Sequence, residues 1–288
     1  MKLSCVTVCV NYSDFLCWSL LSNRSLFDEW IVVSDNDKQV KQMCSYYGAT
    51  YVEASLWEDG KFLKYKGINE GIKALRHKDW VLFLDADIIL PPVTKRVLQN
   101  IQLEKNNLYG IDRINITGIE NWISYVNNPN LIQNNWLVDL SKHEVGSRIC
   151  HYYGNGETNE FSGWKPLGFF QLAHYSKAKT YPQECDGADH CDVVFANQWE
   201  RNIRILIPEI VGVHLESVDN TWGLNWKGRK SSPFNYPPVD TTPVPIPNPL
   251  VPTPWVNPYN PYPTPQPPYK IGDFPPFNND ITITYGKD

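Results

Sequence analysis

The sequence predicts an α/β protein with a mostly parallel sheet, helices on both faces of that sheet, and an extended, proline-rich C-terminal tail. Apolar, β-branched runs alternate with helical patterns through residues 1–230, which is typical of parallel sheets whose strands are buried on both faces. With 288 residues and 42% hydrophobic content, the chain is long enough to bury a large core. The tail is predicted because 17 of the 23 prolines lie between Pro233 and Pro276.

Each strand is predicted from an apolar run and each helix from a helical pattern. The first strand, LSCVTVCV at residues 3–10, precedes a helix over 13–24. The segments that follow are the strand WIVVSD (30–35), a helix over 37–47, the strand ATYVEA (49–54), the helix KGINEGIKALRH (66–77), the strand DWVLFLDADIIL (79–90) and the late apolar run RILIPEIVGVHLES (204–217). This order predicts one domain over residues 1–230.

Proline density separates residues 231–288 from this domain. Proline lacks a backbone donor and fixes φ near the polyproline value, so neither a helix nor a central strand can form there. We expect a largely unstructured tail, in which PTPQPP and PVPIPNP could bind a polyproline-recognising partner through an aromatic groove. The final ITITYGKD alternates and is interpreted either as an edge strand or as a free end.

The charge balance and the cysteines narrow the class of protein. A net charge of −5 provides no basic footprint, so no nucleic-acid partner is expected. The apolar stretch at the N-terminus, about eight residues, is too short for a signal peptide or a membrane span. The seven cysteines are odd in number and form no C-x-x-C pair. This pattern argues against a disulfide framework or zinc knuckle and predicts reduced thiols and a cytoplasmic location.

Two carboxylates, Asp85 and Asp87, close the apolar run in DWVLFLDADIIL. In open α/β sheets ligands bind beyond the carboxyl ends of the strands, which is where these residues fall. Residues two apart on a strand face the same way, so both carboxylates converge on one ligand if the strand stays extended to Asp87. A divalent cation bridged to a phosphate would compensate their repulsion. The alternative is a solvated pair at a strand end.

Four segments, CVTVCVNYSDFL, WIVVSDND, KGINEGI and DWVLFLDADIILPP, resemble the nucleotide-sugar-binding half of the GT-A glycosyltransferases, and glycosyltransferase family 2 in particular. The resemblance spans about residues 3–230. It implies a GT-A, Rossmann-like fold. It also implies metal-dependent transfer, with Mn²⁺ or Mg²⁺, of a sugar from a nucleoside-diphosphate sugar to a hydroxyl of a glycan, lipid or protein acceptor. Inversion at the sugar by direct displacement is implied as well.

The resemblance assigns roles in recognising the nucleotide base. Val8, Asn11 and Tyr12, at the end of the first strand, would lie against the base, and Tyr12 could stack on it. Asp35, which closes WIVVSD, would accept a hydrogen bond from the base. Each role has a structural alternative, because Tyr12 could simply pack at the strand end and Asp35 could cap the helix that begins near Asp37.

For the diphosphate and the ribose, the resemblance implies Lys66 and Asn69, at the start of the helix before the Asp-x-Asp segment. Helix N-termini also favour anions, although Lys66 could instead be a solvated helix charge. Asp85 would contact the ribose or join the metal site, whose ligands would be Asp87 and His214. A nitrogen ligand mildly favours Mn²⁺. Without the resemblance, His214 would be interpreted as a structural histidine.

An acceptor hydroxyl is a poor nucleophile at neutral pH and needs a carboxylate that takes its proton. GADHCD resembles the acidic motif that supplies this base in inverting GT-A enzymes, which implies Asp189 as base and Asp192 as an acceptor-orienting carboxylate. Asp189 could instead cap a helix. Lys227 and Arg229 in NWKGR would clamp the diphosphate from a flexible loop, or form a solvated basic turn.

The aromatic-rich stretch NEFSGWKPLGFFQLAHYSKAKTYP lies between these motifs. Sugars present apolar faces to aromatic rings, so Trp164 and Gln171 are candidates for the acceptor platform, although core packing explains most of the rings. Two other classes stay open. A nucleotidyltransferase would typically have a glycine-rich phosphate loop, which VTVCVNYSD lacks, and a non-catalytic sugar-binding or adaptor protein would use the tail. P-loop, dinucleotide-binding and hydrolase motifs do not occur in the sequence.

Overall fold

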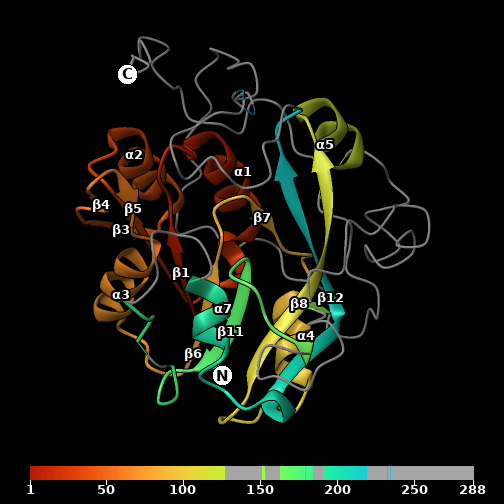
Figure 1. Ribbon diagram of the computed structural model, residues 1–288. Helices are drawn as coiled ribbons and strands as arrows, with labels where there is room; N and C mark the ends of the chain where they lie inside the picture. The colour runs from red at the N-terminus through yellow and green to blue at the C-terminus, as the bar shows by residue number, and fades with distance from the viewer. Residues whose placement is uncertain are drawn as a thin grey trace, which may run out of the picture.

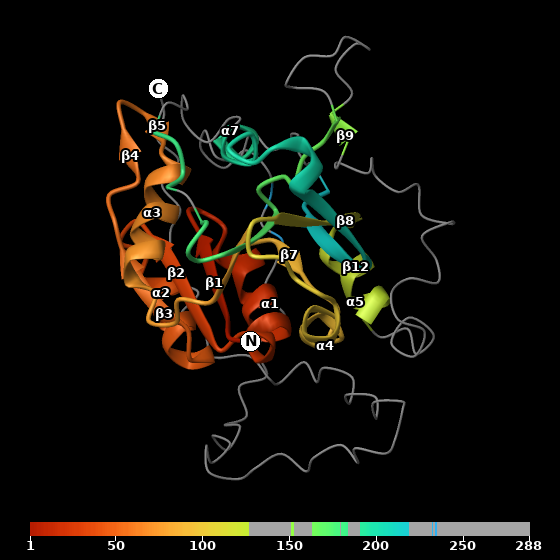
Figure 2. The ribbon, with the colours of Figure 1, turned by 90° about the horizontal axis from the view of Figure 1, so that it is seen from below.

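A computed structural model shows a mostly parallel sheet of eight strands, with helices on both faces as the sequence predicts (Figures 1 and 2). It describes residues 1–126, 151–152, 163–178, 180–183 and 191–218, together with Ser232 and Phe234. The strands of this sheet, in spatial order, are β3 (Thr50–Glu53), β2 (Glu29–Ser34), β1 (Leu3–Val8), β6 (Trp80–Leu84), β11 (Phe170–His174), β8 (Leu108–Thr117), β12 (Arg204–Glu216) and β7 (Ile88–Ile89).

The pairing of these strands is parallel except at two of them. β3, β2, β1 and β6 pair in parallel in that order, and β12 pairs in parallel with β8. β11 is antiparallel to both β6 and β8, and β7 is antiparallel to β12. Two short antiparallel pairs stand apart from the sheet, β4 (Trp57–Glu58) with β5 (Lys61–Phe62) and β9 (His151–Tyr152) with β10 (Gly163–Trp164).

Each face of the sheet has its own hydrophobic core. The first core contains Phe15 of α1 and Trp122 of α5, and the second contains Ile68 of α3 and Phe195 of α7. The helices on the first face are α1 (Ser13–Asn23), α2 (Lys38–Tyr47), α4 (Thr94–Asn100) and α5 (Ile119–Val126), and those on the second are α3 (Lys64–Ala74) and α7 (Cys191–Ala196). Short 3-10 turns follow α1 (Arg24–Leu26) and precede β12 (Arg201–Ile203).

Local sequence signals set the bounds of α2 and the packing of α3. The Asp37 carboxylate accepts hydrogen bonds from two backbone N–H groups in the first turn of α2, at 2.8 and 3.1 Å, and so caps the helix. Gly48 ends α2 in the left-handed region, with φ of 72°. In α3, a Cβ atom at Gly71 would lie 2.4 Å from Cγ1 of Val6, so only glycine lets this helix approach β1 so closely.

The segment 79–90 differs from the predicted continuous strand. β6 ends at Leu84, the chain turns through residues 85–87, and β7 then pairs with β12 instead of extending β6. Three strands lie between β6 and β7 in the sheet order, although only three residues separate them in the chain. β12 must therefore curl back toward the end of β6. A register shift between Leu206 and Val211, a stretch that includes Pro208, gives it the irregularity that allows bending.

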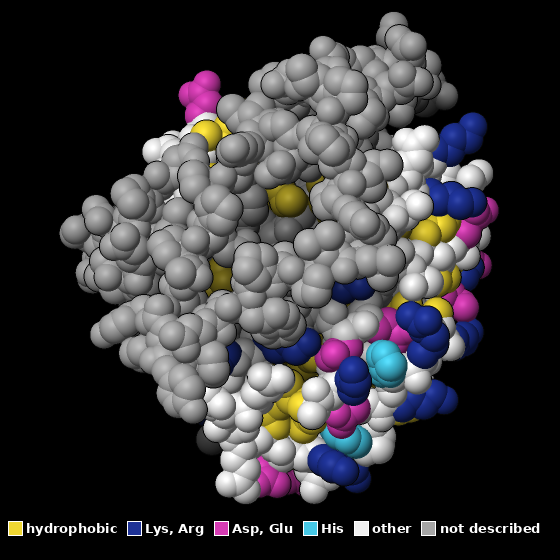
Figure 3. Space-filling view, turned by 180° about the vertical axis from the view of Figure 1, so that it is seen from behind, with side chains coloured by type: hydrophobic (Ala, Val, Ile, Leu, Met, Phe, Trp, Pro, Cys, Tyr) yellow, Lys and Arg dark blue, Asp and Glu magenta, His cyan; other side chains and the backbone are white. Residues whose placement is uncertain are grey.

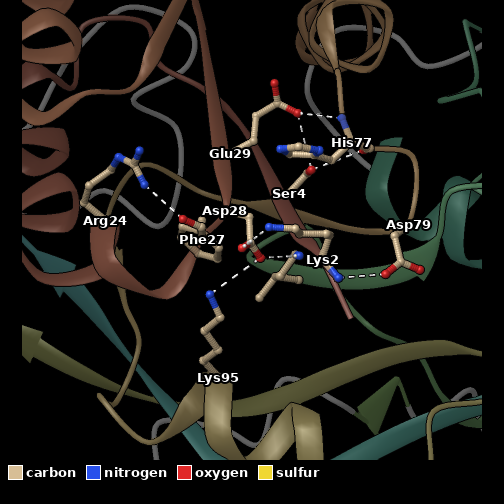
Figure 4. Close-up of polar contacts among 10 residues, drawn as sticks. Lys2, Ser4, Arg24, Phe27, Asp28, Glu29, His77, Asp79 and Lys95 are labelled. Atoms are coloured by element: carbon tan, nitrogen blue, oxygen red, sulfur yellow. Dashed lines mark hydrogen bonds and ion pairs between the residues drawn. The ribbon is translucent and has the colours of Figure 1, made fainter. Parts of the chain in front are cut away.

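At the amino ends of β1 and β2, a polar cluster fastens the sheet to the loop before β6 (Figure 4). The buried Glu29 carboxylate accepts hydrogen bonds from Arg76 Nε at 2.8 Å and from the backbone N–H groups of Arg76 and His77 at 3.0 and 3.1 Å. Asp79 accepts a hydrogen bond from the backbone N–H of Lys2 at 2.7 Å. Although burial alone would raise the pKa of Glu29, the bonds to Arg76 and His77 outweigh it and hold the pKa below its ordinary value of 4.5.

Replacing Glu29 with Gln should lower the free energy of unfolding at neutral pH by about 1.5–3 kcal/mol, because the charged acceptor of several hydrogen bonds is lost. Since the pKa of Glu29 is lower in the folded protein than in the unfolded chain, its contribution is present above about pH 4.5 and is lost as the pH falls through the folded-state pKa. Urea unfolding should show a smaller difference between Glu29→Gln and wild type below pH 4.5. The exposed Glu104, changed to Gln, is the control, and an equal loss in both variants would contradict the prediction.

Ser232 and Phe234, which fall in the expected tail, pack against the fold. Phe234 is 1% exposed, and its ring stacks on that of Phe15 with centroids 4.8 Å apart. The backbone N–H of Phe234 donates to the buried Asp14 carboxylate at 2.5 Å, and the hydroxyl of Ser217 donates to the carbonyl of Ser232 at 2.6 Å. The boundary predicted at residue 230 therefore comes too early, because the folded unit includes Phe234. Residues 235–288 lie outside the described residues.

The substitution Phe234→Ala in the full-length chain should lower the free energy of unfolding by about 3–5 kcal/mol, since it removes a buried aromatic ring and leaves a cavity against Phe15. The matched control is Tyr46→Ala, because Tyr46 is 54% exposed. Equilibrium unfolding in urea measures both. Equal stability of Phe234→Ala and wild type would show that the contact with α1 contributes nothing to the fold.

Acidic and basic side chains are interspersed on the described part of the face in Figure 3.

Within the described ranges, no helix is long and apolar enough to cross a membrane. The cysteines in this part of the chain are buried and carry thiols rather than disulfides; they are Cys5, Cys9, Cys17, Cys44 and Cys191.

Candidate functional site

The strand-end residues that the sequence singles out lie at the carboxyl edge of the parallel strands. β1 ends at Val8, β2 ends one residue before Asp35, and β6 ends one residue before Asp85. Because these three strands are adjacent and parallel, their carboxyl ends meet at the same edge of the sheet, where open α/β folds bind ligands. The polar cluster around Glu29 occupies the opposite edge.

The candidate base-binding residues follow β1 and β2. Asn11 is exposed and has a left-handed φ of 58°. Tyr12 is half-buried directly before α1, and its ring stacks on that of Phe15 with centroids 5.0 Å apart. Asp35 is half-buried after β2. The alternative that Asp35 caps the following helix is wrong, because Asp37 makes both capping bonds.

Asp87 and His214 meet because β7 pairs with β12. Ile88 lies opposite His214 in the ladder, and Asp87 accepts a hydrogen bond on its carbonyl from the N–H of Leu215 at 2.9 Å. This register places Nε2 of His214 3.1 Å from Oδ2 of Asp87, with both side chains about 15% exposed. On its other side, Nδ1 of His214 lies 3.1 Å from Oε1 of Glu216. The imidazole therefore lies between two carboxylates.

The two side chains stabilise each other's charged forms. Burial alone would raise the pKa of Asp87, but His214 and Arg113 outweigh it and hold the pKa below its ordinary value. Burial alone would lower the pKa of His214, but Asp87 outweighs burial and raises the pKa. Asp87 is therefore ionised at neutral pH, as a metal ligand or phosphate-bridging group has to be.

The chemistry of this pair fits a divalent cation. Oδ1 of Asp87 is buried and has no hydrogen-bond partner among the described residues, and such an orphaned carboxylate oxygen is a free coordination site. With the imidazole beside it, the pair offers one oxygen and one nitrogen ligand, which suits Mn²⁺ and, less well, Mg²⁺. In the described part of the chain, no group of three or more His, Cys, Asp or Glu residues could hold a metal. Among the described residues, this pair therefore provides the metal with two protein ligands.

The extended strand that would point Asp85 and Asp87 the same way ends at Leu84, and the two carboxylates have different partners. The strand ends before them, and Oδ1 of Asp85 pairs with Nζ of Lys64 at 2.5 Å. Lys64 is the first residue of α3, and its side chain is 18% exposed. The sequence predicts a role for Lys66, which is also half-buried, but not for Lys64. α3 begins at Lys64, two residues before the predicted start at Lys66. A correct prediction of that start would have indicated Lys64.

Lys64 also approaches α7 from across the site. Burial alone would lower the pKa of Lys64, but Asp85, the Cys191 thiol and Asp192 together raise it well above its ordinary value. Gly168, in the loop before β11, donates its N–H to Oδ2 of Asp192 at 2.7 Å. A Cβ atom at Gly168 would lie 3.1 Å from Nζ of Lys64. Lys64 thus joins α3, the Asp-x-Asp turn and α7 at one point.

Two predicted contact residues are committed to internal hydrogen bonds. Gln171 is fully buried, donates to the carbonyls of Pro166 and Asp192 at 2.7 and 3.0 Å, and accepts from the hydroxyl of Tyr181. The Asn69 amide exchanges hydrogen bonds with the backbone N–H and carbonyl of Tyr181, at 2.9 and 3.0 Å. The structure therefore places Gln171 beneath the site, where it can support α7 but has no exposed surface for an acceptor.

The remaining predicted residues are described only in part. Asp189, Lys227 and Arg229 lie outside the described residues, and of Trp164 only the backbone, in β10, is described. Asp192 is described at the start of α7. Its Oδ1 accepts from the N–H of Val193 at 2.8 Å while its Oδ2 accepts from Gly168.

The sequence matches the glycosyl transferase family 2 profile over residues 4–154. The chain belongs to glycosyl transferase family 2, which confirms the resemblance seen in its motifs and supports a sugar-transferring activity. No curated protein matches the sequence.

Similar solved structures include the galactosyltransferase LgtC in complex with donor and acceptor sugar analogues, with 13% identity over 60% of this chain and 58% of that chain and a TM-score of 0.34. Another is the apo form of the glycosyltransferase GlyE from Streptococcus pneumoniae TIGR4, with 11% identity, 73% and 46% coverage and a TM-score of 0.40. A third is the inositol-1-phosphate CTP transferase from T. maritima, with 7% identity, 78% and 95% coverage and a TM-score of 0.45. The chain thus spans less than two thirds of the LgtC and GlyE chains.

The contact between Lys64 and Asp85 should appear as a coupling energy in a double-mutant cycle built from Lys64→Met and Asp85→Asn. We expect a coupling of about 1–3 kcal/mol in the free energy of unfolding, because either single change leaves a largely buried charge without its partner. The matched cycle with Lys66→Met and Asp85→Asn should give a coupling near zero. Equal coupling in the two cycles would show that the position of Lys64 is not special.

Proposed function

We propose that this protein transfers a sugar from a nucleoside-diphosphate sugar to an acceptor hydroxyl, with Mn²⁺ or Mg²⁺ held by Asp87 and His214. The observation that carries the proposal is the largely buried contact between these two side chains, 3.1 Å long, at the carboxyl edge of the sheet in a family 2 chain. Their two ligand atoms leave the other coordination positions to phosphate oxygens and water. When bound, the ion would neutralise charge on the departing nucleoside diphosphate.

The other residues at this edge would bind and orient the donor. Asp85, held in place by Lys64, would accept a hydrogen bond from the ribose, because Oδ1 is engaged by Nζ of Lys64 while about a third of the Asp85 side chain remains exposed. Tyr12 and Asp35, at the ends of β1 and β2, would contact the base. Asn11 and Val8 would complete that surface. Lys66 would add positive charge near the diphosphate from the first turn of α3.

Asp189 is proposed to take the proton from the acceptor hydroxyl. Asp192 is the less suitable base, because both of its carboxylate oxygens already accept backbone N–H groups and are engaged within the fold. Asp192 would instead hold the loop at Gly168 in position beside the site. Direct attack by the activated hydroxyl would invert the configuration at the transferred sugar.

The acceptor is proposed to be a glycan, lipid or protein hydroxyl, and Trp164 is a candidate for its platform. Lys227 and Arg229 are proposed to clamp the diphosphate. The proline-rich residues beyond Phe234 are proposed to recruit a polyproline-recognising partner. A reducing compartment such as the cytoplasm suits the buried thiols of the described cysteines.

The substitution Asp87→Asn should abolish metal-dependent donor binding while leaving the fold intact, because it keeps the shape of the side chain and removes its charge. Calorimetric titration with a panel of nucleotide sugars, in Mn²⁺, Mg²⁺ or chelator, should show one metal-dependent donor for the wild type. Its affinity should fall by about 100-fold or more in Asp87→Asn, since even outer-shell changes at metal sites cost 10- to 100-fold.

The matched control is Glu104→Gln, an exposed carboxylate replaced in the same way, which should bind as the wild type does. If no nucleotide sugar binds the wild type under any metal condition, the proposed function is wrong. Metal-independent binding that persists in Asp87→Asn would support the proposed donor and contradict the proposed metal.

A further inference from the structure

β7 follows directly on Asp87 and, among the described residues, pairs with a strand on one side only. Toward β12, the carbonyl of Asp87 accepts from the N–H of Leu215, and Ile89 lies opposite Val213. Backbone groups alternate in direction along a strand, so the carbonyl of Ile88 and the N–H of Leu90 point away from β12. In the described part of the sheet, β7 is an edge, and no strand pairs with these two groups.

The side chain of Asn23 takes the place of that missing strand. Asn23 is the last residue of α1 and is fully buried. Its Nδ2 donates to the carbonyl of Ile88 at 2.8 Å, and its Oδ1 accepts from the N–H of Leu90 at 2.8 Å. A carboxamide combines a donor and an acceptor at one end. It therefore satisfies a carbonyl and an N–H two residues apart, as a paired strand would.

We infer that Asn23 is a positioning residue that fixes the backbone of Ile88–Leu90 and thereby holds Asp87 opposite His214. The two-residue strand β7 follows directly on the turn at Asp85–Asp87, so its own ladder with β12 is short. Without Asn23, the carbonyl of Ile88 and the N–H of Leu90 would both be left unpaired in a buried environment, which is costly. The expected effect on metal binding rests on the proposed function, whereas the restraint on β7 does not.

The test compares Asn23→Leu with Met43→Ala in the full-length chain. Leucine keeps the approximate volume of asparagine but makes neither hydrogen bond. Met43 is fully buried in α2, in the same core, so its truncation destabilises the protein without touching β7's hydrogen bonds. Two readouts separate a positioning role from a general loss of stability. They are amide hydrogen exchange at Leu90, and the affinity for Mn²⁺, measured by electron paramagnetic resonance, in the presence of the nucleoside diphosphate that the wild type binds best.

We expect exchange at Leu90 to be about 10-fold faster in Asn23→Leu than in Met43→Ala, when each is compared at the same interval below its own melting temperature, because one net hydrogen bond is lost. The Mn²⁺ affinity should fall about 10-fold in Asn23→Leu, because Asn23 positions a metal ligand without binding the metal itself. It should stay at the wild-type value in Met43→Ala. The inference is overturned if exchange at Leu90 is equal in the two variants, or if Asn23→Leu binds Mn²⁺ as tightly as the wild type.

The proposed function can fail separately from this inference. If the wild type binds no nucleoside diphosphate with Mn²⁺, the proposed function is wrong, and exchange at Leu90 alone then decides whether Asn23 holds β7. If the wild type binds and Asn23→Leu binds equally well despite faster exchange, the metal site stands and the positioning role does not.

Discussion

The antiparallel pairing of β7 with β12 is the constraint on which the rest of the site depends. It brings together Asp87 and His214, which are 127 residues apart in the chain. Because only three residues connect β6 to β7, this pairing requires the far edge of the sheet to curl back over the end of β6. The irregularity in β12 near Pro208 and the buried amide of Asn23 both serve this arrangement, one by allowing β12 to bend and the other by satisfying the open edge of β7.

Carboxylates concentrated at one sheet edge repel each other unless cations compensate them. Basic side chains of the protein supply part of this compensation. Lys64 pairs with Asp85, while His214 and Arg113 lower the pKa of Asp87. As a result the two carboxylates of the Asp-x-Asp turn, although adjacent, are held by different parts of the fold. Each partner comes from a separate element, so the geometry of the site depends on how α3, β7 and β12 pack together.

The position of the site follows from the sequence because it needs only local information. Apolar runs locate the strands, and the residues that follow them, such as Asp35 and Asp85, must lie at the carboxyl edge of a parallel sheet. The partners of these residues do not follow in the same way. Lys64 and Lys66 are both near the start of one helix, and which of them faces Asp85 depends on where that helix begins and how it is rotated. Asn69 and Gln171 were predicted to contact ligands because they are polar and lie near the predicted site. In the structure, both instead form hydrogen bonds with Tyr181.

By itself, the sequence determined the α/β class, the order of the main strands and helices up to β6, the family and the sheet edge at which Asp35 and Asp85 lie, because each of these is encoded in short-range patterns of apolar, polar and turn-forming residues. Only the tertiary structure decided that the strand breaks at Asp85, that Asp85 pairs with Lys64 while Asp87 pairs with His214, that Asn23 completes the edge of β7, and that the fold reaches Phe234. These features depend on contacts between residues far apart in the chain, and the free energy of such contacts is set by how whole elements pack rather than by the residues on either side of each position.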